Sequence, residues 1–140
     1  MTTAETEDII VRPLHKNEAA EVANCDFSGE VFAYGDREGC FAIISKHNRK
    51  LIGTILCPEE DKDLVMVIHK TERDLGYGEA ALSIALNFLF GDLGRREVFA
   101  SCPADDSPSV KTLINAGMEK IGEDAGKERW HITREQWETL

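Results

Sequence analysis

Hydrophobic residues fall into short runs along this chain, and one stretch combines a strand pattern with a helix pattern. Residues 64–68 (Leu-Val-Met-Val-Ile) are apolar and rich in β-branched side chains, which predicts a buried strand. Residues 79–90 have the composition and spacing of a helix that faces a core. The turn between them ends in Gly76-Tyr77-Gly78. The pattern therefore predicts a strand, a glycine turn and a long helix in succession.

The other apolar runs predict further strands and helices around this unit. We expect strands at 9–13, 40–45, 51–57, 63–69, 96–102, 118–122 and 128–133, and helices at 17–24, from 79 to about 93, and at 106–116. Residues 25–39 are expected as a loop, 46–50 and 123–127 as hairpin turns, and 134–140 as a helical turn. Gly94 and Gly117 are expected to end the two later helices. The second to fourth strands should form an antiparallel meander, and the fourth and fifth a parallel pair with a right-handed crossover.

The glycine turn is a candidate anion site. The first four N–H groups of a helix lack internal partners, and the helix dipole adds about half a positive charge there. Glycines at 76 and 78 let a ligand approach the backbone closely. Amides from about Leu75 to Glu79 could therefore hold a phosphate or pyrophosphate. An ordinary tight strand–helix connection is the alternative that the spacing leaves open.

Composition indicates a single globular domain, residues 1–140. The sequence is 42% hydrophobic and 30% charged, with an acidic, polar beginning and no apolar stretch of membrane-spanning length. We therefore expect no secretory signal, no membrane partner and a cytoplasmic location. The four cysteines lack C-x-x-C spacing and the histidines lack ligand spacing, which argues against a disulfide framework and a metal site.

The net charge of −10 narrows the classes of molecule that this chain is expected to bind. Nucleic acid binding rests on basic patches, so we expect no nucleic acid partner. An acidic surface suits a cationic or amine-bearing substrate, although acidity also aids solubility. Lys70 and Arg73 flank the glycine turn and supply local positive charge for an anion.

Several motifs in order resemble the GNAT superfamily of acyl-CoA-dependent N-acyltransferases. The element order β-α-β-β-β-α-β-α-β-β carries the pattern R-x-x-G-x-G at residues 73–78, after the fourth strand. Gly53, the segments 106–109 and 113–118, and the ending 130–137 match as well. The Gly-Tyr pair and that ending look most like the ribosomal-protein alanine N-acetyltransferase branch. The resemblance runs from about Cys40 to Trp137.

The resemblance implies an α/β (α+β) fold with acetyl-CoA as cosubstrate and no metal. The sheet would be mixed and mostly antiparallel, six- to seven-stranded, with helices on both faces and splayed fourth and fifth strands. The pantetheine arm would pair with backbone of the fourth strand, and the pyrophosphate would rest on the amides of 74–79. The implied coenzyme-binding residues are Met66, Val67, Ile68, Arg73, Asp74, Leu75, Gly76, Tyr77, Gly78, Glu79, Asp106, Ser109 and Lys111.

The same resemblance implies direct attack of an amine on the thioester, which needs a proton acceptor and a proton donor. Asp63 aligns with a glutamate that related sequences carry, and it would act through water. Ser109 is the nearest hydroxyl for the leaving thiolate, because the chain lacks the usual tyrosine there. His69 ranks lower, since it lies beside the pyrophosphate turn. Asp106 stands where relatives often have asparagine, and a carboxylate cannot donate the amide's hydrogen bond.

Three functions follow from these observations. The first is an N-acetyltransferase acting on a primary amine, either a protein N-terminus or a small amine. The second is a non-catalytic acyl-CoA sensor or scaffold domain, suggested by Asp106 and the missing tyrosine. The third is a nucleotide-phosphate binder, although G-x-x-x-x-G-K-[ST] and GxGxxG are both absent. The acceptor-side segment 14–40 is short for the branch, which favours an extended substrate, a lid from a homodimer partner or no tight substrate.

Overall fold

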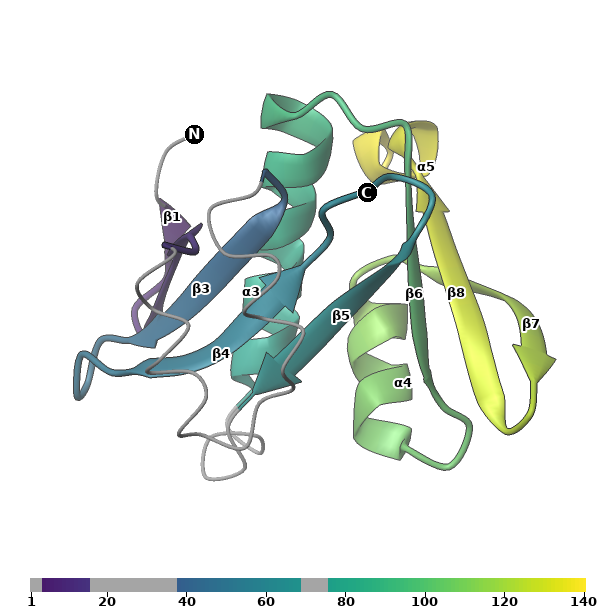
Figure 1. The fold of residues 1–140 in the computed structure, drawn as a ribbon, viewed down its shortest axis with the longest axis horizontal. Coiled ribbons are helices and arrows are strands. Elements are labelled where there is room, and N and C mark those ends of the chain that lie inside the picture. The colour runs from purple at the N-terminus through teal and green to yellow at the C-terminus, as the bar shows by residue number, and fades with distance from the viewer. Residues whose placement is uncertain (1–3, 16–37, 69–75) are drawn as a thin grey trace.

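A single mixed sheet organises the computed structural model, which describes residues 4–15, 38–68 and 76–140 (Figure 1). Its eight strands follow the order β1-β2-β3-β4-β5-β6-β8-β7. They are β1 (Ala4–Glu5), β2 (Ile9–Pro13), β3 (Cys40–Ser45), β4 (Leu51–Leu56), β5 (Asp63–Ile68), β6 (Glu97–Pro103), β7 (Glu119–Asp124) and β8 (Lys127–Thr133). The described helices are α3 (Tyr77–Asn87), which continues as the π-helical turn η3 (Phe88–Asp92), α4 (Ser107–Asn115) and α5 (Arg134–Glu138).

Strands β5 and β6 form the one parallel pair in this sheet, and their pairing is short. Asp63 lies opposite Phe99 and Leu64 opposite Ala100, after which the strands separate. In Figure 1 the two strands lie close together at one end and diverge toward the edge where α3 and α4 begin. The expected mixed sheet with a splayed fourth and fifth strand is therefore confirmed.

The main core lies between the sheet and the two longer helices. Apolar side chains of α3 and η3 pack with alternate residues of the strands, and Phe41 stacks on Phe88 with ring centroids 5.4 Å apart. Leu113 of α4 joins the same cluster. Because successive strand residues point to opposite faces, the intervening side chains form a smaller cluster on the other face. Its buried members are Leu14, Cys40, Ala42, Leu51 and Leu56.

The end of α3 combines an expected glycine with contacts that the sequence did not predict. Gly94 has a φ of 66°, the left-handed conformation predicted for the residue after a helix. The widening of the last turn into η3 was not predicted. There the carbonyl of Phe90 accepts a hydrogen bond from Nη2 of Arg134, and Leu89 O accepts one from Arg95 N at 2.9 Å. Gly117, with a φ of 93°, follows α4 as expected.

The differences from the sequence-based expectation are local. The two-residue strand β1 was missed, because two residues carry no detectable pattern. The last hairpin turns at Ala125-Gly126, both with positive φ, so the expected turn at 123–127 was too wide. The helix expected at 17–24, most of the loop expected at 25–39 and the turn residues 69–75 lie outside the described residues. Within residues 4–15, 38–68 and 76–140, no helix is long and apolar enough to cross a bilayer.

Leu86 tests the packing of α3 on the sheet. It is 1% exposed within the main core, so Leu86→Ala should lower the free energy of unfolding by about 2–5 kcal/mol. Urea denaturation measures this loss. Ser83→Ala, on the exposed side of the same helix, should change stability by less than about 0.5 kcal/mol. Equal stabilities of the two variants would contradict the placement of α3.

Candidate active site

The separation of β5 from β6 leaves one edge of β5 without a strand partner among the described residues. On its other edge β5 pairs with β4 from Val65 to Ile68. On the β6 side, pairing ends at Leu64. Backbone N–H and C=O groups on an open strand edge can pair with an extended ligand. The predicted coenzyme residues Met66, Val67 and Ile68 all lie on this unpaired stretch.

The start of α3 differs from the starts of the other two described α-helices. Gly76 is its N-cap, with a φ of 76° and no side-chain capping hydrogen bond. By contrast, Asp106 caps α4 and Thr133 caps α5, the latter in a capping box with Gln136. A Cβ on Gly76 would meet no atom within 4 Å, so the space beside the turn is open. Among the described residues, the start of α3 therefore has open space beside it and no side-chain cap.

The structure describes only part of the predicted pyrophosphate turn. Arg73, Asp74 and Leu75 lie outside the described residues. Tyr77 packs partly against the main core, and Oε1 of Glu79 accepts a hydrogen bond from Nδ2 of Asn115 at 2.8 Å. This bond ties the start of α3 to the end of α4. Lys111 is exposed on α4.

Asp106 and Ser109 bind each other. Oδ1 of Asp106 accepts from the Ser109 amide at 3.3 Å, and Oδ2 accepts from the Ser109 hydroxyl at 2.7 Å. Pro108 lies in the first turn of the same helix, as expected. The carboxylate thus has a local role that needs no coenzyme, because it satisfies donors at the beginning of α4.

Sequence reasoning predicted Asp63 but missed the row of side chains that lies beside it on the sheet face opposite α3 and α4. Nε of Arg129 donates to Oδ1 of Asp63 at 3.1 Å, and its guanidinium lies 4.4 Å from the centroid of the Phe99 ring. The imidazole of His131 stacks on the same ring at 4.6 Å, and its Nε2 lies 2.9 Å from Oε1 of Glu97. The only sequence signal is the alternation of these residues with the buried Val98, Ala100, Trp130 and Ile132. This row crosses three strands at the point where β5 and β6 pair.

Two buried cysteines are poor nucleophiles. Burial raises the pKa of the Cys57 thiol, and the positive charge of Arg95, whose Nη1 lies 3.9 Å from Sγ, opposes the shift only in part. Burial also raises the pKa of Cys102, with Glu128 acting in the same direction. Because the thiolate is the reactive form, neither residue is suited to carry an acyl group at neutral pH. Cys40 is free and buried as well.

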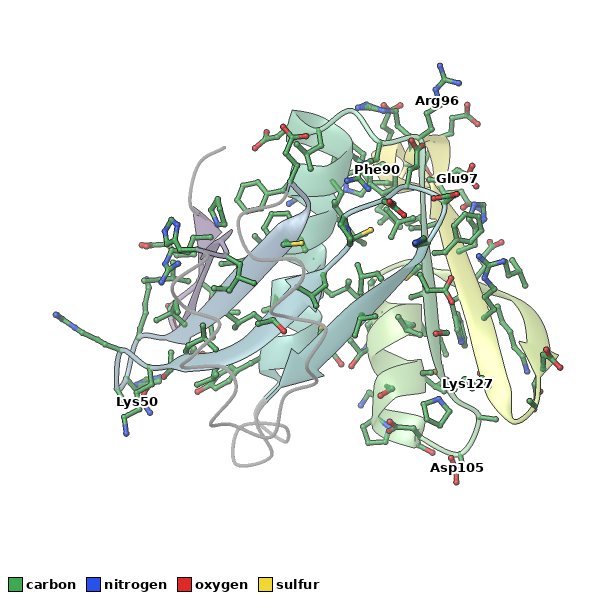
Figure 2. All side chains as sticks on the ribbon, in the orientation of Figure 1. Lys50, Phe90, Arg96, Glu97, Asp105 and Lys127 are labelled. Carbon is green, nitrogen blue, oxygen red and sulfur yellow. The ribbon has the colours of Figure 1, made fainter. Side chains whose placement is uncertain are left out.

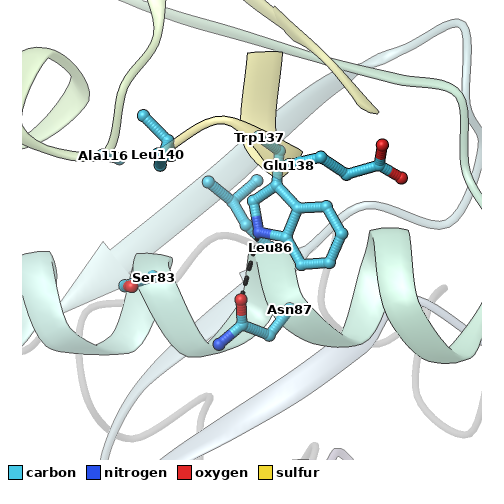
Figure 3. A pocket seen from close by; sticks show the side chains of 7 residues that line it. All are labelled: Ser83, Leu86, Asn87, Ala116, Trp137, Glu138 and Leu140. Carbon is cyan, nitrogen blue, oxygen red and sulfur yellow. Dashed lines mark hydrogen bonds between the residues drawn. The ribbon is translucent and has the colours of Figure 1, made fainter. Parts of the chain in front are cut away.

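A separate hollow of about 420 Å³ lies on the outer side of α3 (Figure 3). Trp137 covers part of it, donating from Nε1 to Oδ1 of Asn87 at 3.1 Å and stacking on Phe90 at 5.2 Å. Its lining residues are Ser83, Leu86, Asn87, Ala116, Trp137, Glu138 and Leu140. None of the predicted site residues is among them, so this hollow is distinct from the candidate site.

Comparison with known families identifies the class of protein. Residues 3–119 match the acetyltransferase (GNAT) domain, and the chain belongs to this family. The resemblance drawn from the sequence motifs is therefore confirmed. A comparison with curated protein sequences found no match.

Solved structures share the fold at low sequence identity. A ribosomal-protein-alanine acetyltransferase from Vibrio fischeri aligns with a TM-score of 0.78 and 16% identity over 98% of this chain and 99% of its own. A GNAT-family acetyltransferase from Bacillus anthracis aligns with a TM-score of 0.73 and 16% identity, over 96% of this chain and 99% of its own. A chimeric spermidine N-acetyltransferase from Vibrio cholerae aligns with a TM-score of 0.78 and 12% identity, over 96% of this chain and 100% of its own. At these identities the likeness establishes the fold alone.

Asp106 tests whether its carboxylate mainly stabilises α4. Asp106→Ala should lower the free energy of unfolding by about 1 kcal/mol, because the first turn loses its side-chain acceptor. Asp106→Asn should lose less, since an amide oxygen can still accept. The neighbouring exposed Asp105, changed to alanine, is the control in the same urea measurement. If Asp106→Ala and Asp105→Ala unfold alike, the cap does not stabilise the helix.

Proposed function

We propose that this protein transfers an acetyl group from acetyl-CoA to a primary amine by direct attack of the amine on the thioester. The observation that carries the proposal is the free edge of β5 beyond Leu64. The chain runs from this edge to the uncapped start of α3, so an extended arm and a diphosphate could be bound by consecutive backbone groups. Membership of the GNAT family supports the same reading.

The residues present fit the coenzyme. Backbone of Met66, Val67 and Ile68 would pair with the pantetheine arm, and the amides of 74–79 would hold the pyrophosphate. Open space beside Gly76 leaves room for that group. Arg73 and Lys111 would add positive charge near the phosphates. Bound acetyl-CoA would supply the acetyl thioester, while the chain supplies orientation and hydrogen-bond donors.

The two proposed proton-transfer residues already have partners. Asp63 would take the ammonium proton through water, although Arg129 occupies its Oδ1. The Ser109 hydroxyl, proposed for the thiolate, donates to Asp106. Ser109 would have to break its bond to Asp106 to protonate the thiolate, whereas Asp63 could accept a proton on Oδ2 while Arg129 remains on Oδ1.

The acceptor is proposed as a small amine or a protein N-terminus. The net charge of −10 favours a cationic molecule. Structural neighbours named for ribosomal protein and for spermidine acetylation are compatible with either choice. We further propose one domain over residues 1–140, a cytoplasmic location, and a short acceptor-side segment at 14–40 that leaves room for an extended substrate or a second copy of the chain in a homodimer.

A non-catalytic acyl-CoA-binding domain is the second candidate. The observation that favours it is the mutual bond between Asp106 and Ser109, which engages the only proposed acid. Such a domain would bind the coenzyme with the same backbone groups and release no thiol.

Thermal unfolding with ligands tests the coenzyme. Acetyl-CoA at about 100 times its dissociation constant should add about 2.7 kcal/mol of stability and raise Tm by several degrees. ATP shares the phosphates but lacks the pantetheine arm, so it should produce no comparable shift. Equal shifts with both ligands would instead favour a nucleotide-phosphate site. Release of free thiol with a panel of amines and N-terminal peptides then separates an enzyme from a binding domain.

Gly76 tests the position of the pyrophosphate site. Gly76→Val should weaken acetyl-CoA binding at least tenfold, because a β-branched residue cannot hold the φ of 76° and the amides would reorient. Gly94→Val is the matched control, since Gly94 also has positive φ and open surroundings but lies beyond the other end of the helix. Calorimetric titration measures both affinities. Unchanged binding by the Gly76 variant would refute this position of the site.

A further inference from the structure

The pair formed by Glu97 and His131 lies on the paired side of the point where β5 and β6 separate: His131 is level with Phe99, and Glu97 lies two residues farther from the opening along β6. Phe99 is the register partner of both Asp63 on β5 and His131 on β8. The three residues therefore lie at one level of the sheet, and Asp63 is one of the two β5 residues that pair with β6. With strands about 4.8 Å apart, the backbone of His131 is about 10 Å from that of Asp63, and its ring leans over Phe99.

This pair lies on an open face. Val98, Ala100, Trp130 and Ile132 point into the core with α3 and α4, so the residues between them point the other way. The His131 side chain is 22% exposed and the Asp63 side chain 31% exposed, which admits water to both. Asp63 and Arg129 also line a groove of about 500 Å³ that continues over Ser101 toward Asp124 and Lys127. Figure 2 marks the two ends of the β6–β8 ladder with Glu97 and Lys127.

We propose that His131, oriented by Glu97, accepts the proton of the acceptor ammonium through water. The proposal rests on the proposed acetyl transfer and adds to it the residue that prepares the amine. A carboxylate that holds one ring nitrogen of a histidine fixes the ring and stabilises the imidazolium that forms. The same carboxylate leaves the second ring nitrogen to accept a proton.

His131 is better suited to this step than Asp63. Arg129 is permanently charged and donates to Asp63, so taking up a proton would weaken an existing ion pair. An imidazole changes its charge between about pH 5 and 8, which suits a proton acceptor near neutrality. The charged groups facing His131 are Glu97 on β6, its register partner Glu119 on β7, Asp63 on β5 and Arg129 on its own strand.

The proton balance of the reaction is complete with this residue. The ammonium gives one proton through water to His131, and the neutral amine then forms a C–N bond with the acetyl carbon. The C–S bond breaks, the departing sulfur takes a proton from the Ser109 hydroxyl or from water, and the second nitrogen proton replaces it. His131 finally returns its proton to solvent. The products are an amide, a free thiol and one proton.

The pH dependence of thiol release tests the proposal. For wild type, kcat/KM should rise with pH and then level off once the proton acceptor is neutral. For His131→Gln it should be about 100-fold lower at pH 7 and rise about tenfold per pH unit, because only amine that is already neutral reacts. Glu97→Gln should lower kcat/KM by a smaller factor, with the same change in its pH dependence. A weakly basic amine, such as 2,2,2-trifluoroethylamine, should restore the His131→Gln rate nearly to wild type.

His47→Gln is the matched control. His47 also pairs with a carboxylate, Asp8 at 2.8 Å, but it lies in the β3–β4 turn and should leave the profile unchanged. The thermal shift with acetyl-CoA should be the same in all three variants and wild type, which checks the fold and the coenzyme site. A loss for His131→Gln that is equal at every pH and for every amine, or no loss, would overturn the role of His131 alone. Absence of thiol release by wild type would overturn the proposed acetyl transfer and this proposal with it.

Discussion

The short parallel contact between β5 and β6 is the constraint on which the site depends. Leu64 and Ala100 are buried in the core on one face, and on the other face the Asp63–Arg129 ion pair joins β5 to β8 across β6. The pairing is therefore held from both sides at Asp63–Leu64 and ends there. Among the described residues, no strand pairs with the β6-facing edge of β5 beyond Leu64, so its backbone groups there are available to water or a ligand.

The three described α-helices differ in how their first turns are capped. Asp106 and Thr133 satisfy the first amides of α4 and α5 with their own side chains. Gly76 offers no such group to α3, although α3 carries more of the core than either of the other helices. Since α3 is stabilised by packing, it needs no side-chain cap. The carboxylate of Asp106, by contrast, serves as the cap of α4.

Much of the fold could be predicted because its signals are local. The β-branched run in β5, the apolar spacing of α3, and Gly94 and Gly117 after the helices each act within a few residues. The row of side chains around Phe99 could not be predicted in this way. Asp63 and Arg129 are 66 residues apart, and they meet only because β6 pairs in one register with β5 and in another with β8. Side-chain contacts that depend on the register between strands cannot be predicted from a pattern along the chain.

The contacts at the far end of α3 bear on how the protein can be handled. Arg134 donates to the Phe90 carbonyl, and Trp137 stacks on Phe90 and bonds to Asn87, so the last helix is fastened to the end of α3 and η3. That end lies about 20 Å from Gly76 by helix length. Truncation within α5, or a fusion that displaces it, would therefore disturb an anchor of α3.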